Sequence, residues 1–139
     1  MKIIAIIQAR LGSTRLPNKV VKKIVGKTMI EILLTRLSQS KKINQIIVAA
    51  PLSKLNDSLQ VLVESLGYEC FRGEEKDVLT RYNEAAKKFN ADTIIRITGD
   101  CPLVDSDLVD DCIKKFEFLK LDYLSNTVPE TYPDGLDVE

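Results

Sequence analysis

Apolar residues follow two alternating patterns along the chain. Short continuous apolar runs are typical of strands buried on both faces of a sheet, whereas apolar residues spaced three or four apart are typical of amphipathic helices. The continuous runs predict strands at Ile3–Ile7, Gln45–Ala50, Tyr68–Phe71 and Thr93–Thr98, with one further short strand at Asp122–Ser125. The spaced residues predict helices over 30–37, 59–66, 78–89 and 108–116.

The regular alternation of these elements predicts the fold class. Strands that alternate with helices form βαβ units, so we predict an α/β protein with a mainly parallel sheet. Local signals agree, because Thr28 and Glu31 have the spacing of a capping box and Gly67 follows the second helix. No repeat, low-complexity segment or linker interrupts the pattern. Residues 1–139 are therefore predicted to form a single domain.

Composition and charge narrow the possible functions. The 139 residues are 45% hydrophobic and 29% charged, as in globular proteins. Twenty basic residues balance twenty acidic ones, so no overall field favours nucleic acid or an anionic membrane, and no apolar run is long enough to cross a membrane. The absence of histidine excludes His-based triads and His metal sites. Three cysteines without a Cys-x-x-Cys pair, and a first apolar run too short for a signal peptide, predict a cytoplasmic protein.

The segment QARLGSTRLPNK, residues 8–19, directly follows the first predicted strand. Ligands of parallel α/β sheets bind beyond the carboxyl ends of the strands, where this segment must lie. Gly12 lets the backbone approach a ligand closely, Ser13 offers a hydroxyl, and Arg15 and Lys19 supply cations suited to phosphate oxygens. We therefore predict a phosphate-binding loop; the alternative is a solvated surface loop whose charges have no ligand.

Asp100 holds a comparable position after the fourth long predicted strand. A single carboxylate that faces a phosphate site suits Mg²⁺, which binds one or two carboxylates together with substrate oxygens and water. The alternative is a loop aspartate that accepts hydrogen bonds from nearby backbone amides. Asp105 is predicted to cap the last helix. The sequence Gly26-Lys27-Thr28 resembles the end of a P-loop, but Val21 stands where that motif needs glycine, so we interpret Gly26 as a turn residue.

Four stretches together resemble the cytidylyltransferase family. They are QARLGSTRLPNK, GKTMIEILLTRL, GEEKDVLTRYNEAAKKFNADTIIRITGDCPLVD and YPDGLDVE, and they occur in family order over nearly the whole chain. The match is strongest to the branch named for the spore coat polysaccharide biosynthesis protein, which is related to the CMP-sialic acid and CMP-KDO synthetases. The resemblance implies a Rossmann-like three-layer αβα fold of the nucleotide-diphospho-sugar transferase type.

The resemblance also implies an activity and its residues. CTP would activate a sugar or sugar acid and release pyrophosphate, for cell-surface or spore-coat polysaccharide biosynthesis, with Mg²⁺ as cofactor; a homodimer is compatible with the family. The implied nucleotide-binding residues are Gln8, Ala9, Arg10, Gly12, Ser13, Arg15, Lys19, Asp77 and Arg81. The implied catalytic residues are Arg15, Lys19 and Asp100, of which Asp100 holds the metal. The implied acceptor residues are Tyr132, Asp134, Asp137 and Glu139.

Some features depart from the family and leave alternatives open. Thr98 stands where the sugar-acid synthetases often carry glutamine, which weakens the case for a sugar-acid acceptor. Family members usually continue beyond the position of Glu139, so we expect part of the acceptor site to be missing and the last residues to be poorly ordered. One alternative is a nucleotide-binding domain without catalysis of its own. Another is a glycosyltransferase of similar core, whose Asp-x-Asp motif would be Asp105-Ser106-Asp107, although helix capping explains these residues too.

Overall fold

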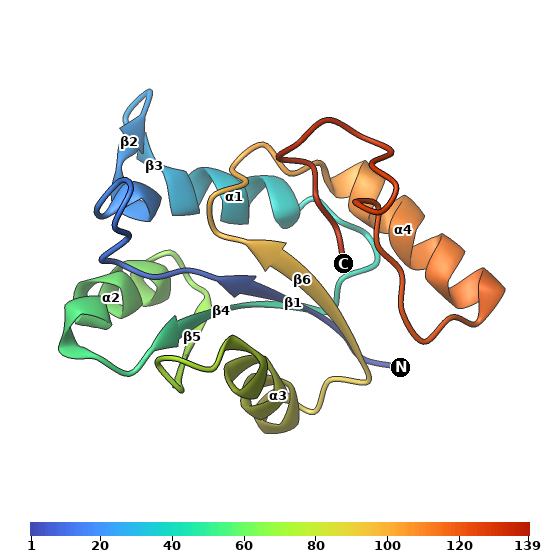
Figure 1. The fold of residues 1–139 in the computed structure, drawn as a ribbon, viewed down its shortest axis with the longest axis horizontal. Helices are drawn as coiled ribbons and strands as arrows, with labels where there is room; N and C mark the ends of the chain where they lie inside the picture. Colours follow the sequence, from blue (N-terminus) through green and yellow to red (C-terminus); the bar gives the residue numbers. More distant parts are fainter.

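A four-stranded parallel sheet is the centre of the computed structural model, which describes all 139 residues (Figure 1). Its strands are β1 (Ile3–Gln8), β4 (Gln45–Pro51), β5 (Glu69–Gly73) and β6 (Thr93–Thr98). Their order across the sheet is β5-β4-β1-β6, and every neighbouring pair is parallel. In β1, one of the two inner strands, Ile7 is in register with Val48 of β4 and Ile97 of β6. The parallel sheet predicted from the alternating pattern is confirmed.

All four predicted helices are present. They are α1 (Met29–Leu37), α2 (Asp57–Ser65), α3 (Val78–Phe89) and α4 (Ser106–Leu119). Two predicted caps are confirmed: the Thr28 hydroxyl accepts a hydrogen bond from the Glu31 amide at 3.2 Å, and the Asp105 carboxylate accepts one from the Leu108 amide at 2.9 Å. None of these helices has the length and apolarity needed to span a membrane.

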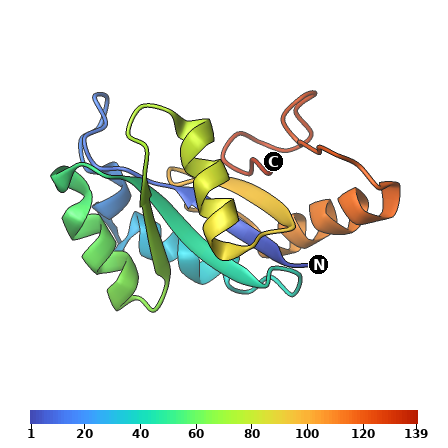
Figure 2. The same cartoon turned by 90° about the horizontal axis from the view of Figure 1, so that it is seen from below.

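Side chains of β1 alternate between two hydrophobic layers. Ala5 and Ile7 pack in a cluster with residues of α1, α2 and α4, whereas Ile4 and Ile6 pack in a second cluster with residues of α3. Figures 1 and 2 show α3 on one face of the sheet and α1 and α4 on the other. Both faces of the sheet are therefore covered by helices. Because the side chains on both faces are buried, the strands are continuous apolar runs in the sequence. The predicted three-layer αβα architecture is confirmed.

The connections hold short elements that the apolar pattern did not predict. They are two 3₁₀ helices, η1 (Lys19–Val21) and η2 (Lys54–Asn56), and the strands β2 (Lys23–Ile24) and β3 (Lys27–Thr28) of a small antiparallel hairpin. Gly26 lies at the tip of this hairpin with φ +84°, so its interpretation as a turn residue is confirmed. Elements of two or three residues are too short to produce an apolar period.

The predicted strand at Asp122–Ser125 is wrong. After α4 the chain is irregular, apart from one isolated bridge between Thr127 and Glu130. The segment is four residues long and polar at both ends, and Tyr123 within it is mostly exposed. Without a neighbouring strand its backbone groups have no ladder to join.

The last residues are held in place, contrary to the expectation that they are poorly ordered. The buried Asn126 side chain accepts a hydrogen bond from the Val138 amide at 2.9 Å and donates one to the Leu136 carbonyl at 2.8 Å. The Arg96 amide of β6 donates to the Glu139 carbonyl at 2.7 Å, and the Arg96 guanidinium pairs with the Glu139 carboxylate. In Figure 1 this segment, in red, returns toward the sheet beside β6.

Asp110 of α4 fixes the turn between α1 and β4, and its loss is expected to destabilise the fold. The Asp110 carboxylate is 5% exposed; it accepts a hydrogen bond from the Ser40 hydroxyl and from the Lys41 and Lys42 amides, the last two at 2.9 and 3.3 Å. Asp110→Ala leaves the Ser40 hydroxyl and the Lys41 amide without their acceptor, whereas the Lys42 amide still donates to the Ser40 hydroxyl oxygen. We therefore expect the free energy of unfolding to fall by about 2–3 kcal/mol in urea titrations.

Asp111 provides the matched control. Its carboxylate is exposed and pairs only with Lys114 on the same helix, at 2.9 Å. Asp111→Ala is expected to change the free energy of unfolding by no more than about 0.5 kcal/mol. Equal losses in the two variants would show that Asp110 does not hold the turn.

Candidate functional site

A polar cleft lies at the carboxyl ends of β1 and β6. The two strand ends are in contact there, since the Gly99 amide donates a hydrogen bond to the Gln8 carbonyl at 2.7 Å. The cleft has a volume of about 240 Å³. It is lined by Gln8, Ala9, Arg10, Ser13, Thr14, Arg15, Lys19, Val20, Thr98, Gly99 and Asp100. This is where ligands bind in open parallel sheets.

The cleft brings together most residues of the predicted phosphate and metal sites. These are Gln8, Ala9, Arg10, Ser13, Arg15, Lys19 and Asp100. Thr14, Val20, Thr98 and Gly99 complete the lining; each lies within two positions of a predicted residue. Residues 8–20 and 98–100 are far apart in sequence and meet only because β1 and β6 are adjacent.

Lys19 and Asp100 form an ion pair across the cleft. The Lys19 Nζ atom lies 2.8 Å from Asp100 Oδ2, and the two side chains are 30% and 47% exposed. The hydrogen bond from Lys19 is the largest cause that lowers the pKa of Asp100, and a hydrogen bond from Thr98 acts in the same direction. A lowered pKa keeps Asp100 ionised at neutral pH, and the pair is lost only as the pH falls toward and below the ordinary aspartate range. The carboxylate is thus charged and is already paired with the Lys19 ammonium group.

Gly99 is required by the close approach of the two strand ends. A Cβ atom at this position would lie 2.7 Å from the Gln8 carbonyl oxygen and 3.1 Å from the Ala9 Cβ atom. The oxygen belongs to the backbone of the neighbouring strand and cannot rotate away. Glycine therefore lets β6 bring Asp100 against the loop that follows β1.

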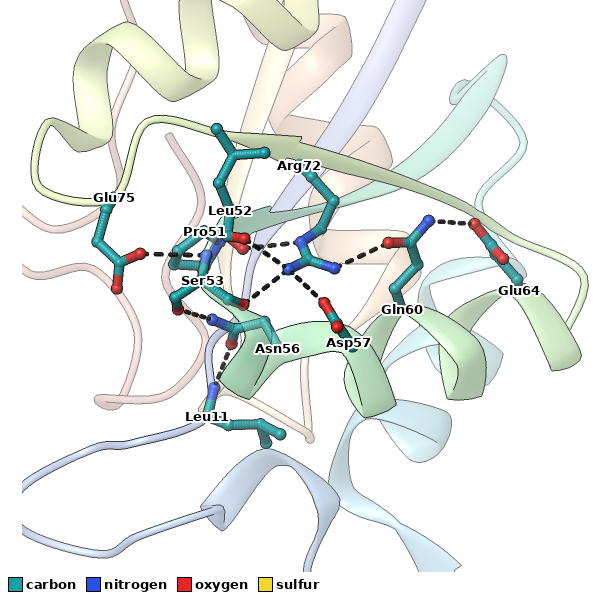
Figure 3. Close-up of polar contacts among 10 residues, drawn as sticks. All are labelled: Leu11, Pro51, Leu52, Ser53, Asn56, Asp57, Gln60, Glu64, Arg72 and Glu75. Carbon is teal, nitrogen blue, oxygen red and sulfur yellow. Dashed lines mark hydrogen bonds and ion pairs between the residues drawn. The ribbon is translucent and has the colours of Figure 1, made fainter.

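The start of the loop after β1 is anchored by Asn56. This side chain is 1% exposed; its Oδ1 atom accepts a hydrogen bond from the Leu11 amide at 2.8 Å, and its Nδ2 atom donates to the Ser53 hydroxyl at 2.9 Å (Figure 3). Gly12 has φ +82°, and a Cβ atom there would lie 2.7 Å from the Leu55 side chain. Gly12 does not line the cleft, so its visible role is to turn the loop beside η2.

Arg72 of β5 supports the segment that carries Asn56. Its guanidinium donates hydrogen bonds to the Pro51 and Ser53 carbonyls, at 2.7 and 2.8 Å, and pairs with the Asp57 carboxylate at 3.0 Å (Figure 3). Sequence reasoning missed both Asn56 and Arg72. Neither residue lies within a predicted strand or helix, so no pattern in the sequence marked them.

Asp77 and Arg81 lie outside the cleft lining. The Asp77 carboxylate caps α3 by accepting hydrogen bonds from the Thr80 amide and hydroxyl at 3.0 and 2.7 Å. The buried Arg81 guanidinium donates to the Glu74 and Glu75 carbonyls, and its Nε atom has no partner. Burial lowers the pKa of Arg81. The predicted role of these two residues in nucleotide binding stays a prediction.

The predicted acceptor residues are not gathered in one place. Glu139 pairs with Arg96, and the half-exposed Tyr132 lines a separate hollow beside α4, together with Asp105 and Asp107. Burial raises the pKa of the Cys101 thiol, and the Asp134 and Asp137 carboxylates also raise it. Asp134 and Asp137 themselves do not line the cleft. The Asp-x-Asp sequence at 105–107 lies at the start of α4, outside the cleft.

The cleft offers one carboxylate to a metal ion. No group of three or more His, Cys, Asp or Glu side chains in the 139 residues could hold a metal on its own. One carboxylate with adjacent space for phosphate oxygens and water fits Mg²⁺ that is shared with a bound phosphate group, and the Lys19 ammonium shows that Asp100 accepts a cation.

A comparison with models of protein families assigns this chain to a family. A family model described as cytidylyltransferase matches residues 4–132. The chain belongs to the cytidylyltransferase family. A cytidylyltransferase structure from Leptospira borgpetersenii superposes with a TM-score of 0.95 at 36% identity, over 99% of this chain and 59% of that chain. The family resemblance of the four sequence stretches is confirmed.

Two further relatives within the family have different names and matched lengths. The spore coat polysaccharide biosynthesis protein SpsF of Bacillus subtilis is 38% identical over 112 residues, which cover 78% of this chain and 47% of that protein. A structure of CMP:2-keto-3-deoxy-manno-octonic acid synthetase in complex with CTP superposes with a TM-score of 0.74 at 27% identity, over 85% of this chain and 48% of that chain. This cytidylyltransferase chain spans about half the length of the curated relatives it matches.

Proposed function

We propose that the cleft between β1 and β6 binds the triphosphate of CTP with Mg²⁺, and that this chain supplies the nucleotide-binding part of a cytidylyltransferase that activates a sugar or sugar acid. The observation that carries the proposal is the meeting of three cations, Arg10, Arg15 and Lys19, with a single carboxylate, Asp100, at the carboxyl ends of adjacent strands. A triphosphate with one Mg²⁺ has the charge distribution that this set complements.

The residues of the cleft would act by positioning the nucleotide and by stabilising charge. The planar Arg10 and Arg15 guanidinium groups suit phosphate oxygens, and each charge-assisted hydrogen bond contributes about 1.5–3 kcal/mol. Asp100 would hold Mg²⁺, which supplies Lewis-acid stabilisation of the phosphate charge when bound. Such chemistry needs little more than positioning and electrostatics, so a chain without histidine can carry it out.

The proposed reaction is nucleotidyl transfer. A hydroxyl oxygen of the acceptor would attack the α-phosphorus of CTP in line, the bond to the oxygen bridging the α- and β-phosphorus would break, and pyrophosphate would leave while the hydroxyl proton passes to solvent. The CTP in the structure of the manno-octonic acid synthetase and the polysaccharide function in the name of SpsF support cytidine and a sugar-type acceptor. By the family resemblance, the acceptor side would include Asp134 and Asp137, which lie outside the cleft lining.

The proposal predicts a specific nucleotide preference. Titration of the chain with CTP, UTP, GTP and ATP in the presence of Mg²⁺, by calorimetry and thermal shift, is expected to give the tightest binding and the largest rise in melting temperature with CTP. A ligand that binds only the native state raises its apparent stability, and at equal ligand concentration the tighter ligand raises it more. Equal stabilisation by ATP and CTP would refute the cytidine assignment and leave a general triphosphate site.

Two variants locate the binding. Arg15→Ala removes a cleft cation and is expected to weaken CTP binding about tenfold or more, the equivalent of one charge-assisted contact. Lys23→Ala removes an exposed cation of β2 that does not line the cleft, and is expected to leave CTP affinity unchanged. If the two variants bind CTP equally well, the cleft is not the triphosphate site.

A further inference from the structure

Lys19 differs from the other cations of the cleft in being paired. Its Nζ atom lies 2.8 Å from Asp100 Oδ2, whereas Arg10 and Arg15 form no ion pair. No Asp or Glu precedes Glu31 in the sequence, so this cationic loop brings no acidic residue of its own. Asp100 is the only carboxylate that lines the cleft. Of the three cations, the one that pairs with it is the flexible lysine.

We propose that Lys19 is a built-in counter-cation of Asp100 that a divalent cation must displace, so that divalent-cation binding and triphosphate binding are coupled through the release of Lys19. The inference rests on the proposed function in one respect: the ligand that the released Lys19 would bind is the proposed triphosphate. It goes beyond that function because it assigns Lys19 two alternating partners and predicts how the metal and nucleotide affinities depend on each other.

The geometry places Lys19 and a divalent cation in competition for the Asp100 carboxylate. Oδ2 of Asp100 already receives the ammonium group, and a divalent cation bound to the same carboxylate would face that positive charge at short range. Lys19 has a four-carbon stem, and its half-exposed position at the start of η1 leaves room to rotate. Once rotated, the ammonium group remains in the cleft with Ser13 and Arg15, where phosphate oxygens would lie.

The coupling has a thermodynamic consequence in both directions. Without a metal, the Asp100 carboxylate pairs with the Lys19 ammonium group and so weakens the attraction of Lys19 for phosphate. Without a phosphate, a divalent cation must break the ion pair with no compensating contact for the lysine. Each ligand therefore lowers the cost of binding the other, and linkage requires the two effects to be equal in free energy. In this arrangement Lys19 acts as a positioning residue for the metal as well as a phosphate ligand.

The test measures Mn²⁺ binding to the 139-residue chain without nucleotide, by electron paramagnetic resonance and calorimetry. Lys19→Met removes the ammonium group and keeps the length of the side chain, so we expect Mn²⁺ to bind about fivefold more tightly than to the wild type, the equivalent of a partly exposed ion pair of about 1 kcal/mol. Lys19→Arg keeps the positive charge and the ion pair, so its Mn²⁺ affinity is expected to stay near that of the wild type.

Arg15→Met tests whether the loss of any positive charge in the cleft raises Mn²⁺ affinity, or only the loss of the charge that is paired with Asp100. It removes one positive charge from the same cleft, but that charge is not paired with Asp100. We expect a much smaller gain in Mn²⁺ affinity than in Lys19→Met. Equal gains in the two variants, or no gain in Lys19→Met, would overturn the proposal.

A second readout uses CTP with and without Mg²⁺. The factor by which Mg²⁺ raises CTP affinity is expected to be smaller in Lys19→Met than in the wild type, because no lysine is left to be released. An unchanged factor would contradict the coupling. If the wild type fails to bind CTP at all, the proposed function fails, and the Mn²⁺ measurements still decide whether Lys19 competes with a divalent cation.

Discussion

Asp100→Asn is expected to abolish the effect of Mg²⁺ on triphosphate binding while leaving the fold intact. The amide has the shape of the carboxylate but lacks the charge that a hard cation requires. Asp100 is the only carboxylate in the cleft, so no neighbour can replace it. We expect Mg²⁺ to improve CTP binding by at least about tenfold in the wild type, as expected for a shared charge contact of about 1.5–3 kcal/mol, and to change it little in the variant. Calorimetric titration with and without Mg²⁺ measures this difference.

Asp105→Asn is the matched control for that experiment. It makes the same chemical change five residues further along the chain, where the Asp105 carboxylate caps α4 by accepting the Leu108 amide at 2.9 Å. Asparagine is an equally good N-cap, so stability and the Mg²⁺ effect should both be retained. An Asp100→Asn protein that keeps the full Mg²⁺ effect would show that Asp100 is only the partner of Lys19 and not a metal ligand.

Gly99→Ala is expected to reduce both stability and CTP affinity. The added Cβ atom would meet the Gln8 carbonyl oxygen at 2.7 Å, so the ends of β1 and β6 must move apart. Over-packing of this kind costs about 1–3 kcal/mol of unfolding free energy. The movement also carries Asp100 away from the loop after β1, and the loss of one charge-assisted contact corresponds to at least about a tenfold loss of CTP affinity. Urea denaturation and calorimetry measure the two effects.

Gly67→Ala separates these two effects. Gly67 has φ +86° after α2, and a Cβ atom there would have no atom within 4 Å, so the variant is destabilised by backbone strain alone. It lies outside the cleft, and CTP affinity should not change. If Gly99→Ala binds CTP as tightly as Gly67→Ala does, the approach of the two strand ends does not position the site.

The sheet, its helices and the location of the cleft could be predicted because each depends on a regular pattern. Buried parallel strands produce continuous apolar runs, and the carboxyl ends of such strands must meet at one edge. That rule alone predicts that the segment 8–19 and Asp100 lie close together, and both contribute to the lining of the cleft. The caps at Thr28 and Asp105 followed from local spacing in the same way.

The supports of the cleft could not be predicted because they depend on contacts between distant segments. Asn56 anchors the loop after β1 across 45 positions of sequence, and Arg72 of β5 holds the segment before Asn56 through the Pro51 and Ser53 carbonyls. Neither residue belongs to a periodic pattern or a motif. The return of the chain to β6 through Asn126 and Val138 was missed for the same reason, and residues expected to be poorly ordered are instead held in place.

The most direct test of the central claim, that the cleft between β1 and β6 binds a triphosphate, is amide chemical-shift mapping of the ¹⁵N-labelled chain with CTP and Mg²⁺. We expect saturable shifts concentrated in residues 8–20 and 98–101, with little change in α4 and the segment after it. A different cavity, lined by apolar residues of β6, α4 and the final segment, including Ile95, Phe116 and Val138, provides the internal comparison. Shifts confined to that second cavity, or no shifts at millimolar CTP, would contradict the claim.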